Sequence, residues 1–258
     1  MDPGTLAGIG IAVLCIFGSM VMEGGNPGAL IAPPAMILVL GGTFGVAMAS
    51  GLMKDATGAG GNMAKALKAK PEPPDDTIAQ MVEFAERARR EGLLALEEVT
   101  KSVEDPFLRK GIELAVDGTD PEELREILEN DIASFRAEQK SGAKFFENMG
   151  GFAPTLGIIG TVIGLVHVLQ NLSDPGKLGP LIASAFVATL WGVMSANVFW
   201  LPIANRLKRV AEIEIHHREL LIEGIISIQA GANPRIVQQR LLSHLSPKDR
   251  ARISEAAA

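Results

Sequence analysis

Long apolar stretches alternate with charged stretches along this chain of 258 residues. The apolar ones run from Gly4 to Met22, Leu30 to Met53, Gly151 to Leu172 and Leu181 to Ile203. A bilayer core of about 30 Å is crossed by about 20 apolar residues in a helix, and a helix satisfies its own backbone polar groups there. Each stretch therefore predicts one transmembrane helix.

The distribution of basic residues predicts how these helices are oriented. Segments 23–29 and 173–180, which would join the helices in pairs, together hold one Lys and no Arg. In contrast, residues 54–149 hold 14 Lys and Arg, and residues 206–258 hold 9. By the positive-inside rule, both basic segments and both termini are cytoplasmic. The predicted fold class is all-α, a polytopic membrane protein with four transmembrane helices and a helical cytoplasmic domain.

Turn signals divide the long charged segment, residues 54–149, into helices. A linker from Pro71 to Asp76 ends in acids that suit a helix N-terminus, and apolar residues then recur at helical spacing. Gly92 interrupts this helix. A further helix begins near Pro106 and stops at Asp117-Gly118.

A stronger start signal follows. Asp120 can cap a helix, Pro121 suits its first position, and Glu123 lies three residues after the cap. In the tail, the pattern predicts a helix over residues 210–228 and a short terminal helix from Pro234. The cytoplasmic part of the chain is therefore predicted to be helical throughout.

The charged segments contain no pattern typical of a soluble enzyme site. The sequence has no phosphate-binding glycine loop followed by Lys and Ser or Thr, no cluster of Cys and His, and no nucleophile elbow. His216 and His217 are adjacent and point to different sides of a helix, and Cys15 has no second cysteine to pair with. We therefore expect no enzyme activity, no cofactor and no bound metal.

Small and hydroxyl-bearing residues follow one face of each of the last two apolar stretches. At steps of three or four they are Pro154, Gly157, Thr161, Leu165 and Val168 in the third, and Ala185, Thr189, Gly192 and Ala196 in the fourth. One interpretation is close helix packing. The two threonines, with Pro154 and Pro202 near the inner ends of the helices, favour a lined ion path that includes a place to bend.

The four apolar stretches contain no carboxylate. Glu23 and Asp174 lie only at their outer edges. Proteins that translocate ions place titratable groups within the membrane, where they bind and release protons or hold cations. If this chain conducts ions, a partner helix must supply the titrating group.

Five segments carry a resemblance to a known family. They read APTLGIIGTVIGLV in the third stretch, ATLWGVMSANVFWLPIANRL in the fourth, and AERARREGLLALEE, GIELAVDGTDPE and IEGIISIQAGANPRI elsewhere. The chain resembles MotA and PomA, the ring subunits of the bacterial flagellar stator, over nearly its whole length. The resemblance implies a subunit that couples inward ion flow to ring rotation and to torque on the rotor.

The same resemblance implies the partners and the location. It predicts a homopentamer in the bacterial inner membrane around a MotB- or PomB-like peptidoglycan-binding subunit, whose membrane helix carries the missing aspartate. Residues 1–53 would form the first transmembrane hairpin and residues 150–205 the second, which lines the ion path. Residues 54–149 would be the cytoplasmic region that contacts the rotor, and residues 206–258 a helical tail.

Individual residues match the family's functional positions. Pro154 and Pro202 match prolines that couple ion passage to movement, and Thr161 and Thr189 match hydroxyls near the ion path. Ala188 stands where sodium-type members have a further threonine. A hard cation needs several oxygen ligands, so this departure favours a proton, with Na+ as the alternative.

The cytoplasmic charges carry a separate expectation. From the pattern alone, Arg87, Arg89, Arg90 and Glu97 read as a solvated helix face. The resemblance instead implies that Arg89, Arg90 and Glu97 contact the flagellar rotor switch protein FliG.

Two other functions remain open at this point. The first is an ExbB- or TolQ-like ion-driven motor, against which the hairpin from Gly4 to Met53 argues, because those proteins have three spans. The second is a passive membrane scaffold or channel subunit, in which the threonine stripes would serve packing alone.

Overall fold

The computed structural model describes residues 4–69 and 74–256, and every regular element in these ranges is a helix. Pro71 to Pro73 of the expected linker lie outside the described residues. The prediction of an all-α chain is confirmed. The chain divides into two compact units, Met1–Lys70 with Glu138–Val210, and Pro71–Ala137 with Ala211–Ala258.

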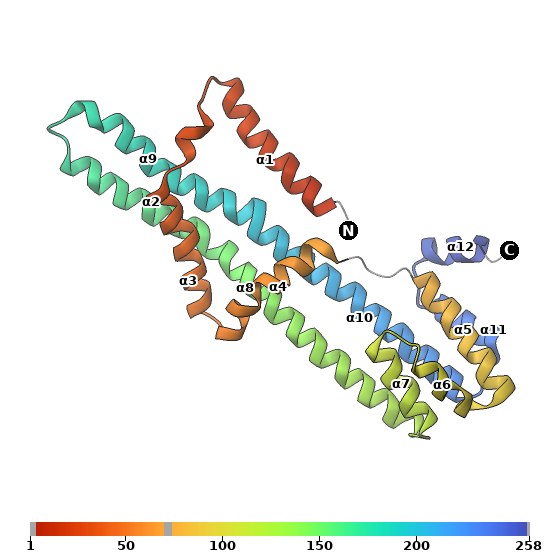
Figure 1. Ribbon diagram of the computed structural model, residues 1–258. Helices are drawn as coiled ribbons and strands as arrows, with labels where there is room; N and C mark the ends of the chain where they lie inside the picture. The colour runs from red at the N-terminus through yellow and green to blue at the C-terminus, as the bar shows by residue number, and fades with distance from the viewer. Residues whose placement is uncertain (1–3, 70–73, 257–258) are drawn as a thin grey trace. The chain divides into compact units, whose positions relative to one another are not determined.

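Each of the helices labelled in Figure 1 lies wholly within one of the two units, except for two long ones. The first unit contains α1 (Gly4–Met22), η1 (Pro27–Leu30), α2 (Pro33–Met36), η2 (Ile37–Gly41), α3 (Gly42–Ala49), α4 (Met53–Lys68), α9 (Pro175–Met194) and η4 (Ser195–Trp200). The second contains α5 (Pro74–Glu91), η3 (Leu93–Leu96), α6 (Glu97–Thr100), α7 (Pro106–Val116), α11 (Pro234–Ser243) and α12 (Pro247–Ala256). Two long helices, α8 (Pro121–Gln170) and α10 (Leu201–Gln229), contribute residues to both. Segments η1 and η3 are 3-10 helices, whereas η2 and η4 are π-helical.

Three apolar helices are long enough to cross a membrane by length and composition, and a fourth is shorter. Within the described residues, the long ones are Gly4–Met22, Pro121–Gln170 and the continuous helix Pro175–Gln229, while Pro33–Ala49 forms the shorter apolar helix. The expected second span from Leu30 to Met53 was therefore too long at both ends. Pro33 and Pro34 cannot extend a helix backwards, because proline lacks the backbone N–H, and the helix stops before Ser50.

The last two apolar stretches belong to longer helices. No helix begins at Gly151, because α8 runs without interruption from Pro121 through the apolar stretch to Gln170. The fourth apolar helix begins earlier than expected, at Pro175, which occupies its first turn. It continues through η4 into α10, so the helix predicted over residues 210–228 is the end of a longer one.

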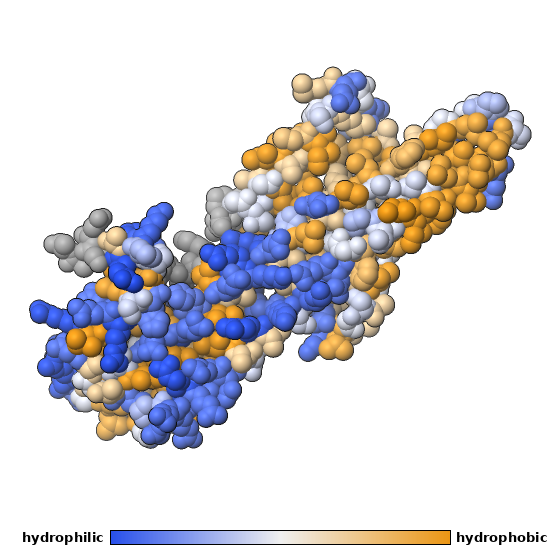
Figure 2. Space-filling model, turned by 180° about the vertical axis from the view of Figure 1, so that it is seen from behind, coloured by the Kyte–Doolittle hydropathy of each residue, from blue (hydrophilic) through white to orange (hydrophobic). Residues whose placement is uncertain are grey.

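Apolar side chains cover much of the first unit (Figure 2). No residue of α1 is buried, although this helix is apolar along its whole length. On α8, Ile158, Val162 and Ile163 are each 56% exposed. Water would oppose the exposure of so much apolar surface, so this surface requires lipid or other protein chains.

The second unit has its own hydrophobic core. Its fully buried side chains come from α5, η3, α7, α8, α10 and α11, and include Met81, Leu108, Leu128, Leu221 and Leu241. These residues recur at helical spacing, so each helix turns one apolar face inward. A small helical domain with charged outer faces results.

Capping residues end and begin the helices of this unit as the sequence predicts. Asp105 accepts a hydrogen bond from the Phe107 backbone N–H at 2.8 Å and so caps α7. At the start of α8, the Asp120 side chain accepts a hydrogen bond from the Glu122 backbone N–H at 2.9 Å. Gly92, with φ of +86°, lies directly after α5, in a left-handed conformation that side chains disfavour. The terminal helix α12 had no counterpart in the prediction.

Candidate functional site

Helices α8 and α9 approach each other closely along their small residues. A Cβ at Gly157 would lie 2.9 Å from the Ala188 carbonyl oxygen, and one at Gly192 would lie 2.6 Å from the Ala153 carbonyl oxygen. At Gly164, a Cβ would lie 2.5 Å from the Ala185 Cβ. Such distances are too short for real atoms, so only glycine permits this packing. The two stripes of small residues therefore face each other.

Thr161 and Thr189 meet at the centre of this contact. Their Oγ1 atoms are 2.5 Å apart, and the Thr161 Oγ1 atom is also 3.0 Å from the Ala185 carbonyl oxygen. The Gly157 carbonyl oxygen is 3.2 Å from the Thr161 Oγ1 atom and 3.3 Å from the Thr189 Oγ1 atom. Two hydroxyl groups supply two hydrogens for four oxygen atoms, so oxygen lone pairs remain. This oxygen cluster can accept a hydrogen bond from water or hold a hydrated ion.

The remaining stripe positions divide into buried and exposed ones. Val168 is 8% exposed and Ala185 is 3% exposed, and Ala185 packs against Gly164 of α8. Leu165, which the sequence placed on the same stripe, is 40% exposed and therefore lies outside the helix contact. A step of four residues overshoots a full turn of 3.6 residues, which carries Leu165 toward the exposed face of α8.

Ala188 lies beside the threonine pair in sequence but packs elsewhere. It is 2% exposed and belongs to a small apolar cluster with Ala35, Val39 and Val187. A Cβ at Gly160 would lie 2.6 Å from the Ala188 Cβ. The methyl group of Ala188 therefore fills space against α2, η2 and α8. A larger side chain there would require these helices to shift.

The two prolines differ in their surroundings. Pro154 lies inside α8, which continues past it without interruption. Pro202 is the second residue of α10, which follows the π-helical segment η4 directly. A proline ring clashes with the carbonyl four residues earlier, which for Pro202 belongs to Val198 inside η4. A π turn widens the helix at that point and accommodates the ring.

An ion pair between Glu147 and Lys208 links α8 to α10 near these prolines. Glu147, seven residues before Pro154, accepts a hydrogen bond from Lys208 of α10 and lies 3.4 Å from the Nζ atom of Lys144. The hydrogen bond from Lys208 lowers the pKa of Glu147 and, with Lys144, outweighs the opposing effect of burial. Sequence analysis missed this pair, because Glu147 and Lys208 are 61 residues apart and no local pattern connects them.

The charged residues expected at the rotor contact gather around one turn of the second unit. Arg89 and Arg90 end α5, and Glu97 begins α6 after the short helix η3. All three are exposed, and within the described residues none of them forms an ion pair. The structure thus brings them together on one hairpin and leaves their charges available.

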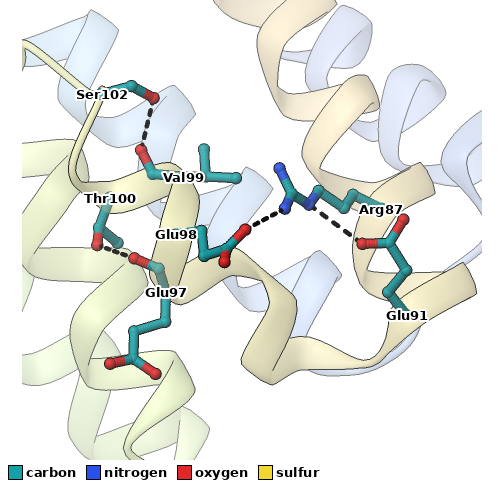
Figure 3. A network of polar contacts seen from close by, with 7 residues as sticks. All are labelled: Arg87, Glu91, Glu97, Glu98, Val99, Thr100 and Ser102. Carbon is teal, nitrogen blue, oxygen red and sulfur yellow. Dashed lines mark hydrogen bonds and ion pairs between the residues drawn. The ribbon is translucent and has the colours of Figure 1, made fainter.

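Arg87 holds this hairpin together (Figure 3). Its Nε atom is 3.3 Å from Glu91 on the same helix, and its Nη2 atom is 3.1 Å from Glu98 on α6. The Thr100 hydroxyl donates to the Glu97 carbonyl at 2.7 Å, which closes the next turn. The spacing of four between Arg87 and Glu91 was visible in the sequence. The pairing with Glu98 depends on the turn at Gly92 and was not.

Two family models match the chain. The model of the MotA/TolQ/ExbB proton channel family matches residues 99–220, and the model of the motility protein A N-terminal region matches residues 6–92. Motility protein A of Bacillus subtilis is 36% identical over 256 residues, which cover 99% of this chain and 95% of that protein. The chemotaxis protein PomA of Vibrio alginolyticus is 36% identical over 251 residues, covering 97% of this chain and 98% of that protein.

Solved structures agree with these matches. The MotAB structure of C. jejuni superimposes with a TM-score of 0.92 at 32% sequence identity, covering 96% of this chain and 97% of that one. The flagellar MotAB stator complex of Bacillus subtilis gives a TM-score of 0.90 at 36% identity, covering 96% and 98%. The similarity therefore extends over both compact units.

Proposed function

The chain belongs to the MotA/TolQ/ExbB proton channel family and to its motility protein A members, and we propose that it works with a MotB-like partner to convert inward ion flow into torque. It is a flagellar motor stator subunit, not an enzyme. The full-length relatives are motility proteins, and the N-terminal match is specific to motility protein A. An ExbB- or TolQ-like motor and a passive scaffold are therefore not favoured.

In this proposal four helices span the bacterial inner membrane, and both termini are cytoplasmic. The second span is the apolar helix Pro33–Ala49, whose 17 residues would be about 25 Å long at 1.5 Å per residue. That length suits a bilayer core of about 30 Å with small adjustments of the lipid. The lysines and arginines concentrated in residues 54–149 and 206–258 support this orientation.

The exposed apolar face of α8 supports assembly with other chains. Five copies of this subunit would surround two copies of the MotB-like partner, whose membrane helix brings the aspartate that the four spans lack. Both structures that superimpose on this chain are of MotAB, and the Bacillus subtilis one is a flagellar stator complex. The partner's outer domain would anchor the complex to peptidoglycan.

The observation that carries the ion-path proposal is the oxygen cluster around Thr161 and Thr189. A proton or hydrated ion that moves toward the partner's aspartate would meet these oxygens in an otherwise apolar contact. Each elementary charge that crosses the membrane releases about 2.3 kcal/mol per 100 mV. Pro154 and Pro202 would allow the helices to bend as the aspartate binds and releases the ion. Ala188 offers no additional oxygen, so the proton is the proposed ion.

Swimming speed measured against sodium concentration, with and without a protonophore, tests this assignment. A proton-driven motor stops when the protonophore is added and keeps its speed when sodium is replaced by potassium. Swimming that survives the protonophore and increases with sodium would show that the coupling ion is Na+. Ala188→Ser then asks whether an added hydroxyl at this position introduces sodium dependence, since serine adds one oxygen atom and no further methyl group to this tightly packed place.

We further propose that Arg89, Arg90 and Glu97 contact the rotor switch protein FliG. The support is that all three are exposed on one hairpin and form no ion pair with any residue that the structure describes. Arg89→Glu should lower torque without lowering the amount of protein in the membrane. Arg235→Glu reverses another exposed charge of the same unit, on α11, and should leave torque unchanged. Loss of Arg89→Glu from the membrane would instead identify a structural role.

A further inference from the structure

Leu94 exposes a large apolar side chain at the tip of the charged hairpin. It lies in η3 and is 71% exposed, whereas Leu96, two residues later, is 1% exposed and belongs to the core. Among the described residues of the second unit, the only other large hydrophobic side chain with high exposure is Ile236, at 44%. Leu94 is thus the most exposed large apolar side chain that the structure places in this unit.

Exposure alone does not identify a site, because single leucines on protein surfaces are common. The conformation of the hairpin is the second observation. Gly92 takes a φ of +86°, and the guanidinium of Arg87 pairs with both Glu91 and Glu98 across the turn (Figure 3). The turn is therefore fixed in a shape that directs Leu93 and Leu96 toward the core and Leu94 into solvent.

The charges around Leu94 are the third observation. Arg89 and Arg90 precede it, Glu97 follows it, and none of the three is paired within the described residues. Specific protein interfaces commonly place an apolar side chain at the centre and charged groups at the rim. The apolar centre supplies binding free energy, whereas the rim supplies orientation and partner choice.

We propose that Leu94 is the apolar anchor of the rotor contact. It enters an apolar pocket of the rotor protein, and this pocket has an acidic group opposite Arg89 and Arg90 and a basic group opposite Glu97. This inference rests on the proposed function, because it assumes that the hairpin faces the rotor. The apolar contact of Leu94 would be insensitive to salt, whereas salt weakens the contacts of the charged side chains.

The test is binding of the purified stator complex to the cognate rotor switch protein at about 50 mM and about 500 mM salt. Leu94→Ala should weaken affinity about 30-fold at both concentrations, since losing an apolar anchor is not screened by ions. Arg89→Glu should weaken affinity strongly at low salt and much less at high salt, because the Debye length falls from about 14 Å to about 4 Å. Ile236→Ala, which truncates the other exposed apolar side chain, is the control and should bind normally.

The outcomes separate the two proposals. If Arg89→Glu weakens binding and Leu94→Ala binds within about twofold of the unchanged protein, the anchor is wrong and the rotor contact stands. If neither change matters, or if the unchanged complex does not bind, the rotor contact itself is wrong, and the anchor with it. Leu94 is too exposed for truncation to unfold the unit, and membrane abundance of the variant checks this directly.

Discussion

The Oγ1 atoms of Thr161 and Thr189 lie 2.5 Å apart, although the two residues are 28 positions apart in the chain. The contact depends on glycines, because a Cβ at Gly157 would come within 3.0 Å of the Thr189 Cα. The close packing of α8 against α9 therefore also brings the oxygen atoms around Thr161 and Thr189 together. The packing interpretation and the ion-path interpretation of these stripes are compatible.

Thr189→Val should abolish most torque while leaving the complex in the membrane. Valine keeps the branched shape of threonine but removes the hydroxyl, so the cluster loses one of its two side-chain oxygens. Thr155→Val is the matched control, since Thr155 is on the same helix as Thr161 but is exposed and bonds only the Phe152 carbonyl within the described residues. Torque of tethered cells and membrane abundance are the measurements. Normal torque in Thr189→Val would leave only a packing role for the pair.

Gly192→Ala should destabilise the complex by roughly 1–3 kcal/mol, the usual cost of overpacking a tight contact. The new Cβ would lie 2.6 Å from the Ala153 carbonyl oxygen, and backbone atoms cannot rotate away. Gly151→Ala is the control, because nothing lies within 4 Å of a Cβ there and alanine favours a helix by up to about 1 kcal/mol. Thermal unfolding of the purified complex compares the two. Equal unfolding temperatures would contradict the close packing of α8 and α9.

Local signals in the sequence were sufficient for most helices of the second unit, although not for α12. Pro106, Asp120 and Gly92 act on the local backbone, so their positions predicted helix ends, and the cap at Asp105 directly precedes the predicted start at Pro106. The apolar stretch from Leu30 to Met53 was misjudged, because hydropathy does not distinguish a transmembrane helix from the turns that flank it. Pro33 marks the true start, as proline restrains the preceding residue.

The site was predictable only in part, for a physical reason. Helical spacing placed Thr161 and Thr189 each on one face, and glycine at 157 and 192 indicated close approach. The distance between the hydroxyls depends on the register of two helices, which no local pattern determines. The same holds for Glu147 with Lys208 and for Arg87 with Glu98, whose partners come from different helices.

Acidification should destabilise the second unit partly through Asp105. Burial raises the pKa of Asp105, but hydrogen bonds from His217 and the Phe107 N–H outweigh it, so the net pKa is lowered. A lowered pKa in the folded state means that the ionised group stabilises the fold above about pH 4, and that this contribution is lost as pH falls through the lowered value. The free energy of unfolding should therefore differ less between pH 7 and pH 3 in Asp105→Asn than in the unchanged protein.

Asparagine can still cap α7, so Asp105→Asn isolates the charge from the capping hydrogen bond. Asp117→Asn, which changes an exposed carboxylate just after α7, should keep the full pH dependence. An identical pH dependence in all three proteins would show that the interaction of Asp105 with His217 contributes nothing measurable.

Arg87→Met should lower torque more than it lowers stability. The two ion pairs of Arg87 are largely exposed, so removing them should cost less than about 1 kcal/mol. Without them, Glu98 is released from α5, and the hairpin that carries Arg89 and Glu97 is held less firmly. Amide hydrogen exchange over residues 93–98 should accelerate, and torque should fall while membrane abundance stays normal.

Lys110→Met is the control, because it breaks a similarly exposed pair with Asp131 in the same unit, away from the hairpin. Arg87→Lys should restore only part of the torque, since one ammonium group cannot match the planar fork that bridges two carboxylates. Torque in Arg87→Met equal to that of Lys110→Met would show that Arg87 does not position the rotor-facing charges.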